Sequence, residues 1–432
     1  MKIRLSVTVM FLFITAVSLF PQKLITLREC YDLALKKTSL AGEKDAYSKI
    51  WKLKDDNLSK GWLPTLDANA SFVYNSDVVD MRGVLSSLPI PGITSAIKPL
   101  PNEQYKITLD INQVIYDGGA IKGAKAIEKA DLGVNQQQTE VDLYKLKGQV
   151  NSCYFTIMLL ARQKELLNNY LERIEKKLKS MQSALNNGVI LQSDIDVLTS
   201  EKIRIGQQLG ENEITKASLV SILSDLTGTT IDPQSQLIMP QTSNDLSDKI
   251  LRPELHVFDL RQEQLDANLK VIQSKRMPKA FGFATLGYGN PPGSNFFKDQ
   301  FAPYYIIGAG AKWNIFDWNK ANNEKQQIKI QQNIIEERKT DLTDNLKRAL
   351  KSKNAEVASL QSLIEKDSEL IALRKRITAE AESKYENGTI TATDYINELD
   401  SEKEAQINSE IHKINLALAQ IEFLNIIGKE IE

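Results

Sequence analysis

The chain has 432 residues, enough for two or three ordinary domains, and a formal net charge of −1. This balance gives no overall attraction to nucleic acid or anionic lipid. The two histidines, His256 and His412, lie far apart in the sequence, which argues against a histidine-based metal site. Cys30 and Cys153 form no CxxC pair and are expected to be free, half-buried thiols. No nucleophile, base and acid stand in a recognisable arrangement, so we expect no enzyme activity, catalytic residue, metal or cofactor.

Residues 1–22 are predicted to be a secretory signal peptide. Lys2 and Arg4 give the positive start, and the apolar run from Leu5 to Phe20 is short for a membrane helix. No clean small-residue pattern marks a cleavage site. No cysteine follows the run closely, so a lipid-anchored N-terminus is not supported.

The first half of the mature chain, residues 23–228, begins with a predicted helix over residues 26–60, for which Thr26 is the N-cap. Trp62-Leu63-Pro64 ends this helix. A β-hairpin is predicted over 65–116, because apolar and polar residues alternate with period two. The apolar face comprises Leu66, Ala68, Ala70, Phe72 and Tyr74 on one strand, and Tyr105, Ile107, Leu109 and Ile111 on the other.

The alternation of these strands has two interpretations. In a soluble sheet the polar face would meet bulk water, whereas in a membrane barrel the apolar face would meet lipid and the polar face would line a lumen. The alternation alone does not choose between them. Aromatic residues at the strand ends favour the barrel, because an interfacial girdle would lie there: Trp62, Tyr74, Tyr105 and Tyr116.

A long helix is predicted from about residue 119 to 186. From Leu146 to Leu185 its apolar residues recur in steps of four and three, as in a coiled coil. Asn187-Gly188 then turns the chain. A return helix is predicted to end near Leu226.

The tip between these two helices covers residues 187–194. Ser193 is the predicted N-cap of the return helix, and Asp194 suits the positive end of its dipole.

A linker over 229–250 leads to the second half, residues 251–432, which repeats the same order of elements. The bounds are a helix at 253–276, a β-hairpin at 279–316 with strands at 280–289 and 304–316, a helix at 319–386, a tip at 387–394, and a return helix at 393–427. Several short motifs recur 200 residues apart, which indicates an internal duplication. They are Asn187-Gly188 with Asn387-Gly388, Asp194 with Asp394, and Tyr116-Asp117 with Phe316-Asp317.

This order of elements, used twice, resembles the TolC family of outer-membrane efflux and secretion channels over residues 24–430. The residues that carry the resemblance are Leu63-Pro64 and Met277-Pro278 before the hairpins, Tyr116-Asp117-Gly118-Gly119 and Phe316-Asp317-Trp318 after them, and the Gly-x5-Asp tips. The resemblance implies long antiparallel helical hairpins and four strands per chain. Since four strands cannot close a barrel, it implies a homotrimer with a twelve-stranded transmembrane β-barrel in outer-membrane lipid.

The resemblance also implies partners and a gate. The chain would be a passive exit duct with a long periplasmic extension, joined at its tips to a periplasmic adaptor and driven by an inner-membrane transporter. The tip residues expected to contact the adaptor are Asn187, Gly188, Val189, Asn387, Gly388 and Thr389. Tyr385 and Asp194 match a pair that is hydrogen-bonded in the family's closed state, and Asp394 matches an aspartate of its constriction ring.

Two family gate residues are missing, because Ile390 stands in place of an arginine and Asn397 in place of a second aspartate. Asp194 and Asp394 would also suit an ordinary helix N-terminus. Two other classes of protein stay open: a periplasmic coiled-coil adaptor or scaffold without a membrane barrel, and a soluble enzyme, which the lack of a catalytic arrangement disfavours. The residues do not separate drug, metal and protein as cargo.

Overall fold

The structure is a computed structural model that describes residues 24–430 apart from 86, 88, 93–98, 242–248 and 296–297. The predicted signal peptide and part of the predicted linker lie outside the described residues. The chain divides into two compact units, and each draws on both sequence repeats. One unit comprises Gly42–Asp142 and Arg252–Asn345. The other comprises Met1–Ala41, Leu143–Leu251 and Leu346–Glu432.

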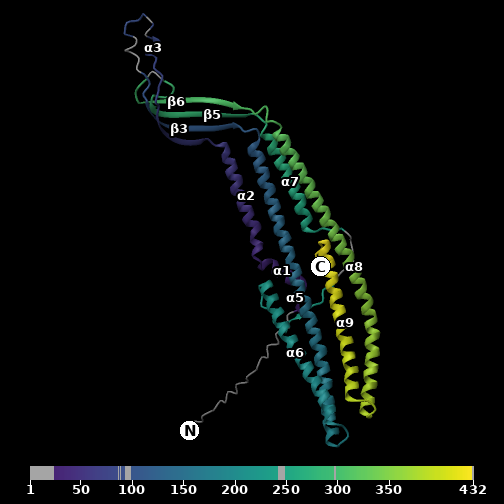
Figure 1. The fold of residues 1–432 in the computed structure, drawn as a ribbon. Helices are drawn as coiled ribbons and strands as arrows, with labels where there is room; N and C mark the ends of the chain where they lie inside the picture. Colours follow the sequence, from purple (N-terminus) through teal and green to yellow (C-terminus); the bar gives the residue numbers. More distant parts are fainter. Residues whose placement is uncertain are drawn as a thin grey trace, which may run out of the picture. The chain divides into compact units, whose positions relative to one another are not determined.

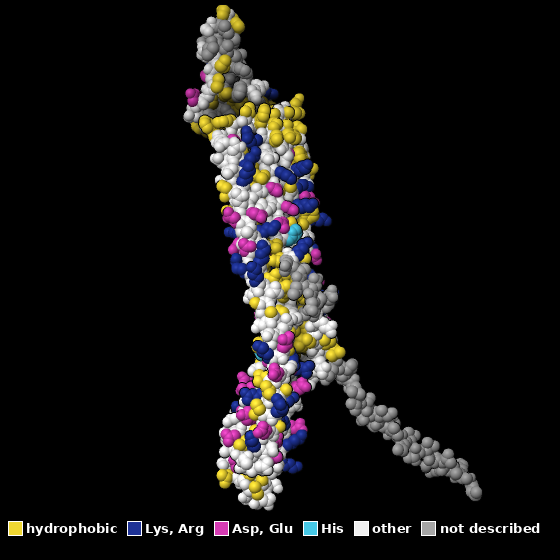
Figure 2. All heavy atoms as spheres, turned by 90° about the vertical axis from the view of Figure 1, so that its right-hand side faces the viewer, with side chains coloured by type: hydrophobic (Ala, Val, Ile, Leu, Met, Phe, Trp, Pro, Cys, Tyr) yellow, Lys and Arg dark blue, Asp and Glu magenta, His cyan; other side chains and the backbone are white. Residues whose placement is uncertain are grey.

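The first unit carries a four-stranded antiparallel sheet in the order β2-β3-β5-β6 (Figure 1). The strands are β2 (Thr65–Tyr74), β3 (Glu103–Tyr116), β5 (Lys279–Asn290) and β6 (Ala302–Lys312). Figure 2 shows hydrophobic side chains gathered over these strands, with charged side chains spread along the helices. The register places apolar residues in continuous rows across one face, such as Ala68, Leu109, Leu286 and Tyr305.

The largest difference between the second β-hairpin and its prediction is at the end of β6. Strand β6 ends at Lys312 rather than at residue 316, and Trp313 instead donates its indole N–H to the carbonyl of Arg276 at 3.0 Å. Strand β5 forms fully, although glycines interrupt its alternation. The ring of Phe283 lies over Gly308 on the neighbouring strand, so an aromatic side chain covers the gap that the glycine leaves.

The predicted helix over residues 26–60 is wrong in one respect, because two helices form instead of one. Helix α1 (Leu27–Lys37) and helix α2 (Glu43–Ser59) are separated by a 3-10 turn at Ser39–Gly42. Thr38 takes an extended conformation, with ψ at 137°, which ends α1. The predicted cap of α1 is confirmed, since Thr26 Oγ1 accepts the Glu29 N–H at 3.1 Å.

The sheet continues into helices through short junctions. Helix α7 (Pro253–Ser274) begins with proline at its first turn, as predicted. Helix α2 is tied to the following long helix by Lys125, whose Nζ lies 3.0 Å from Asp55 Oδ2 and 2.6 Å from Ser59 Oγ. Between β2 and β3, Arg82–Leu85 forms the short helix α3.

The long helices are α5 (Ala120–Asn186) and α8 (Lys320–Glu386), and the return helices are α6 (Gln192–Thr227) and α9 (Ala392–Ile427). Each bound in the second hairpin lies 200 residues after its counterpart in the first. The predicted bounds of α5 and α8 are within one residue of those observed. Within the described part of the chain, no helix combines the length and apolar character needed to cross a membrane.

The second unit has two hydrophobic clusters. One joins α1, α5, α6 and α9 through side chains that are fully buried, such as Leu27, Val150, Leu223 and Ile421. A two-stranded parallel pairing of β1 (Leu24–Ile25) with β4 (Gln236–Leu237) adjoins this cluster and was not predicted, because two-residue strands leave no alternation to detect. The other cluster lies near the tips.

Candidate functional site at the hairpin tips

The two tips have the same backbone turn. Gly188 and Gly388 have φ of 68° and 69°, a left-handed conformation that glycine adopts without strain. The side-chain amides of Asn187 and Asn387 donate to the carbonyls of residues four positions earlier, at 2.9 and 2.8 Å. Val189 is 74% exposed at the end of the first tip. The predicted tip residues therefore form two matched, open turns.

The return helices begin earlier than predicted. Ser193 is not the N-cap of α6; Leu191 is, and its N–H donates to Asp194 Oδ2 at 3.1 Å. In the second tip Thr391 is the N-cap, and its Oγ1 accepts the N–H of Asp394 at 3.1 Å. The prediction placed the N-cap on Ser193, the hydroxyl residue next to the aspartate. The aspartate at the third helical position instead sets where the helix begins, because in both tips its carboxylate accepts the N–H of the N-cap residue.

Both predicted gate aspartates are thus occupied in capping their own helices. Asp394 Oδ2 accepts from Thr391 N at 3.0 Å and from Thr391 Oγ1 at 2.7 Å. These hydrogen bonds hold the pKa of the Asp394 carboxyl below its usual value. The side chain is therefore charged at neutral pH.

Tyr385, the predicted partner of Asp194, packs by its ring. It stacks on Tyr395 with centroids 5.8 Å apart and planes at 11°. Its hydroxyl is buried and has no hydrogen-bond partner among the described residues. Burial, followed by the charge of Asp194, raises the pKa of Tyr385 to about 12. Asp194 is near enough to act on Tyr385 electrostatically, but the hydrogen bond implied by the resemblance is not formed within this chain.

A buried lysine that the sequence analysis did not single out joins the two hairpins at this level. Lys177 on α5 is 8% exposed, and its Nζ lies 3.2 Å from Glu382 and 2.6 Å from Glu386 on α8. The same ammonium lies 5.7 Å from the ring centre of Tyr385 and 5.6 Å from that of Tyr395. A cation is therefore held between carboxylates and aromatic faces, as in a cation–π site.

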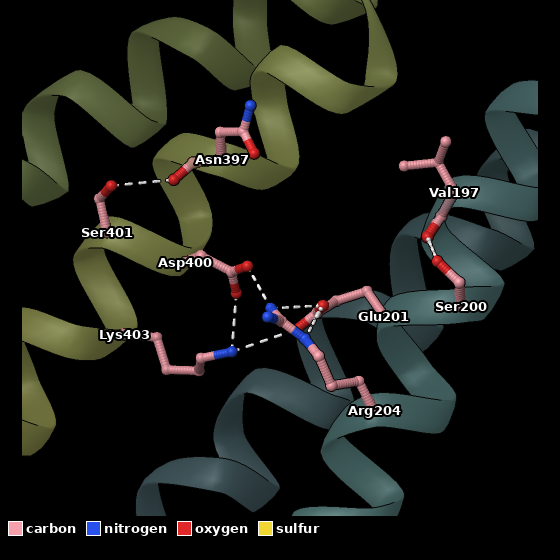
Figure 3. A network of polar contacts seen from close by, with 8 residues as sticks. All are labelled: Val197, Ser200, Glu201, Arg204, Asn397, Asp400, Ser401 and Lys403. Carbon is pink, nitrogen blue, oxygen red and sulfur yellow. Dashed lines mark hydrogen bonds and ion pairs between the residues drawn. The ribbon is translucent and has the colours of Figure 1, made fainter.

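Further from the turns, a closed ring of four charges joins α6 to α9 (Figure 3). Arg204 pairs with Glu201 at 2.6 Å and with Asp400, and Lys403 pairs with Asp400 at 2.7 Å and with Glu201 at 3.1 Å. Each helix contributes an acid and, three residues later, a base. That shared spacing was visible in the sequence. It could not identify the pairing, because the two halves lie about 200 residues apart.

The charges in this ring alternate around it and sum to zero. Burial tends to raise the pKa of Asp400, but hydrogen bonds from Lys403 and Arg204 outweigh burial, and the pKa lies below its usual value. Nearby, Arg173 adds a further ion pair between the hairpins, to Glu402 at 3.2 Å. The two hairpins of one chain are thus joined by ion pairs as well as by the buried apolar side chains of both hydrophobic clusters.

A groove of about 310 Å³ lies on the second hairpin close to its tip. It brings together residues that the resemblance had picked out, Asp394 with Ile390 and Asn397 at the two positions where family residues are missing. Charged side chains line the rest of it: Glu380, Lys384 and Glu398. Across the described ranges, no three His, Cys, Asp or Glu side chains are grouped to hold a metal ion.

The comparisons with known proteins agree with this fold. The family described as "Outer membrane efflux protein" matches residues 56–198. The structure is similar to the outer membrane protein VceC of Vibrio cholerae, at 14% identity and a TM-score of 0.69, over 94% of this chain and 97% of that one. It is also similar to the CmeC outer membrane channel of Campylobacter jejuni, at 14% identity and 0.65, over 93% and 85%.

A third similar structure is the MtrE outer membrane channel of Neisseria gonorrhoeae in its open state, at 14% identity and 0.66, over 94% and 89% of the two chains. No curated protein sequence is significantly similar to this chain. The fold is therefore that of the outer-membrane channels. The predicted resemblance to the TolC family of efflux channels is confirmed by the family match and by these structural likenesses.

Proposed function

We propose that the chain is one subunit of an outer-membrane exit duct that serves an efflux pump or a type I secretion system. The family match and the shared fold support this function. The observation that carries it is the combination, in one chain, of two ion-paired helical hairpins and a sheet with large apolar side chains exposed. Ile107 is 63% exposed and Ile307 is 76% exposed. Such surfaces are rare on a soluble monomer and indicate a partner or a membrane.

The sheet supports assembly from several copies. Among the described residues, β2 and β6 each pair with one neighbour only, so each offers a free edge. A barrel requires about eight strands, which four cannot provide. Three copies would join edge to edge into twelve strands, with the apolar rows facing outer-membrane lipid and residues such as Asp110 facing the lumen.

The tips are the proposed gate. Three copies would bring three Asp394 carboxylates together around one axis, where they would repel one another and attract cations. In the assembled closed state, the unpartnered hydroxyl of Tyr385 would be free to donate to Asp194. Ile390 stands where the family has an arginine, so that position supplies no cation. In this chain Lys177 supplies the cation between the hairpins.

The same tips are the proposed contact for a periplasmic adaptor, which would connect the duct to an inner-membrane transporter. Gly188 and Gly388 have open space around them, so each turn is accessible. The groove beside Asp394 offers both charged and apolar lining to a partner helix.

The test is membrane fractionation followed by single-channel recording of the purified protein in planar bilayers. We expect the protein in the outer-membrane fraction, as a trimer with discrete conductance steps that a trivalent cation blocks less in Asp394→Ala. A mature protein that stays soluble without detergent and conducts no ions would contradict the proposal and favour the coiled-coil adaptor.

A further inference from the structure

The strand-to-helix junctions of the two repeats have the same capping hydrogen bond at their aspartates. Asp117 Oδ2 accepts the N–H of Ile121 at 2.5 Å, and Asp317 Oδ2 accepts the N–H of Ala321 at 3.0 Å. Each aspartate therefore caps the long helix that follows it. The two junctions are structurally equivalent, so what surrounds one predicts what should surround the other.

The residue four positions before each aspartate also makes an equivalent hydrogen bond in both repeats. Gln113 Nε2 donates to the carbonyl of Trp62 at 2.7 Å, and Trp313 Nε1 donates to the carbonyl of Arg276 at 3.0 Å. In both repeats the strand-to-helix junction is thereby tied to the start of its own hairpin. This equivalence matches Leu63-Pro64 with Met277-Pro278.

The residues just after the aspartates differ, although the backbone does not. Gly118 and Gly119 have φ of 71° and 89°, and their counterparts Trp318 and Asn319 keep left-handed values of 53° and 66°. A residue with a Cβ is disfavoured in that conformation. Trp318 is nevertheless 85% exposed, with its ring edge-on to Phe316 at 5.0 Å. A strained backbone that presents an exposed indole points to a contact that one chain lacks.

The first repeat shows what this position touches. Strands β3 and β5 are neighbours, and Gly118 after β3 lies against the junction that begins β5. A Cβ at Gly118 would come within 2.8 Å of Met277 Cβ and 3.0 Å of the Ser274 carbonyl. Within the chain, the junction after one strand therefore packs on the junction before the next, so closely that only glycine fits.

Among the described strands β6 lies at an edge of the sheet, so the second repeat has no such neighbour there. The register places the Lys312 end of β6 at the same end of the sheet as the Thr65 end of β2. If copies join edge to edge, which rests on the proposed function, the junction after β6 meets the junction before β2 of the next copy. That junction exposes Leu63 by 60% and Trp62 by 42%.

We infer that Trp318 of one copy packs on Leu63 of the neighbouring copy and closes the seam between subunits. Leu63 is the counterpart of Met277, which Gly118 touches inside the chain. Within one chain the two junctions pack directly, because Gly118 has no side chain. Between copies, the indole of Trp318 fills the corresponding contact. An exposed apolar surface at each edge is thereby covered by the other.

The test is a disulfide between Trp318→Cys and Leu63→Cys in the full chain, assembled in outer membranes and oxidised. We expect a ladder of linked chains that reaches the trimer and collapses on reduction. Within one chain the two positions lie on opposite edges of the sheet, three strand spacings or roughly 14 Å apart. This exceeds the reach of a disulfide, so a link must join copies.

The matched control is Trp318→Cys with Tyr74→Cys, at the same edge of β2 but at its far end, which should give no ladder. The native Cys30 and Cys153 are buried and stay in every variant. A native mass measurement separates the outcomes. If trimers form without a cross-linked ladder, the contact between Trp318 and Leu63 is excluded and the proposed channel function stands. If no trimer forms, the proposed function is contradicted as well.

Thermal dissociation of the trimer in detergent gives a second measurement. Trp318→Gly should lower the dissociation temperature, although it relieves the backbone strain. Asn319→Gly relieves the same kind of strain without removing an apolar ring, and should leave that temperature unchanged or raise it. Quenching by brominated phospholipid that is present in the wild type and lost in Trp318→Phe would place the indole in the bilayer and overturn the seam.

Discussion

Lys403 Nζ lies 3.1 Å from Glu201 Oε1, although the two residues are 202 positions apart and each side chain is 6% exposed. Burying two charges costs desolvation energy that their mutual attraction repays only when the remaining donors and acceptors are also satisfied. Here Arg204 and Asp400 satisfy them. The ring therefore specifies how the two hairpins meet more than it stabilises them.

We expect Glu201→Leu to destabilise the folded protein by about 3 kcal/mol, because the buried Lys403 and the half-exposed Arg204 each lose a carboxylate partner. Glu201→Leu with Lys403→Leu should cost much less than the sum of the single changes, since the Arg204–Asp400 pair stays neutral and complete. Denaturant unfolding of all four forms measures the coupling. Lys202→Ala, which removes an exposed ion pair to Glu175, is the control and should change stability by under about 0.5 kcal/mol. Additive costs would show that the ring does not act as a unit.

Lys177→Met should loosen the tip, because Glu382 and Glu386 then repel each other beside two aromatic rings without a cation. We expect a higher basal single-channel conductance with the trimer still formed. The adjacent Lys176 is 74% exposed and pairs within its own helix, so Lys176→Met is a matched control that should conduct like the wild type. Equal conductance in both variants would remove Lys177 from the gate.

The family pair is tested separately by Tyr385→Phe combined with Asp194→Ala. A hydrogen bond to a charged acceptor is worth roughly 1.5–3 kcal/mol, enough to shift an open–closed population at least tenfold. If the assembled closed state forms this bond, basal conductance should rise in the double variant. Wild-type conductance there, with a rise in Lys177→Met, would show that the lysine has taken over the role of the pair.

The tips should carry partner recognition rather than stability, because their turns bury little surface. Gly188→Arg and Gly388→Arg both place a large side chain at a left-handed residue with open space around it. We expect near-normal trimer abundance and loss of efflux with the cognate adaptor. Loss of the folded trimer instead would make the two glycines structural.

The faces of the sheet should respond differently to charge. Ile107→Arg would place a cation in the hydrocarbon and cost about 2–4 kcal/mol at mid-depth. Asp110→Lys, on the opposite face, should assemble normally and shift ion selectivity towards anions. Assembly assays and reversal potentials measure the two effects. Equal damage to assembly would exclude the division into lipid and lumen faces.

Acid should weaken the joint between α6 and α9. The pKa of Asp400 is lowered in the folded protein, so its stabilising contribution is complete above its ordinary value of about 3.9 and is lost as pH falls through the folded pKa. The difference in thermal stability between wild type and Asp400→Asn should therefore be largest near neutral pH and shrink below about pH 4. A difference that does not change with pH would mean that the charge of Asp400 is not what stabilises the joint.

The sequence by itself determined the duplication, the order of elements and most helix bounds. These follow from local rules: heptad spacing, proline placement, and Asn-Gly turns that leave a helix no way to continue. The predicted long helices end within one residue of those observed, because capping groups such as Asn187 and Asp317 act on their own neighbourhood.

Only the tertiary structure decided how the charges are matched. Nothing in the sequence around Lys177 distinguishes it from an ordinary surface lysine. Its side chain is buried because Glu382 and Glu386 approach from a helix more than 200 residues away in the sequence. The β1–β4 pairing was likewise invisible, since it joins segments distant in sequence. Periodicity reports which face of an element is buried, and the partner of a buried charge is fixed only when the elements pack.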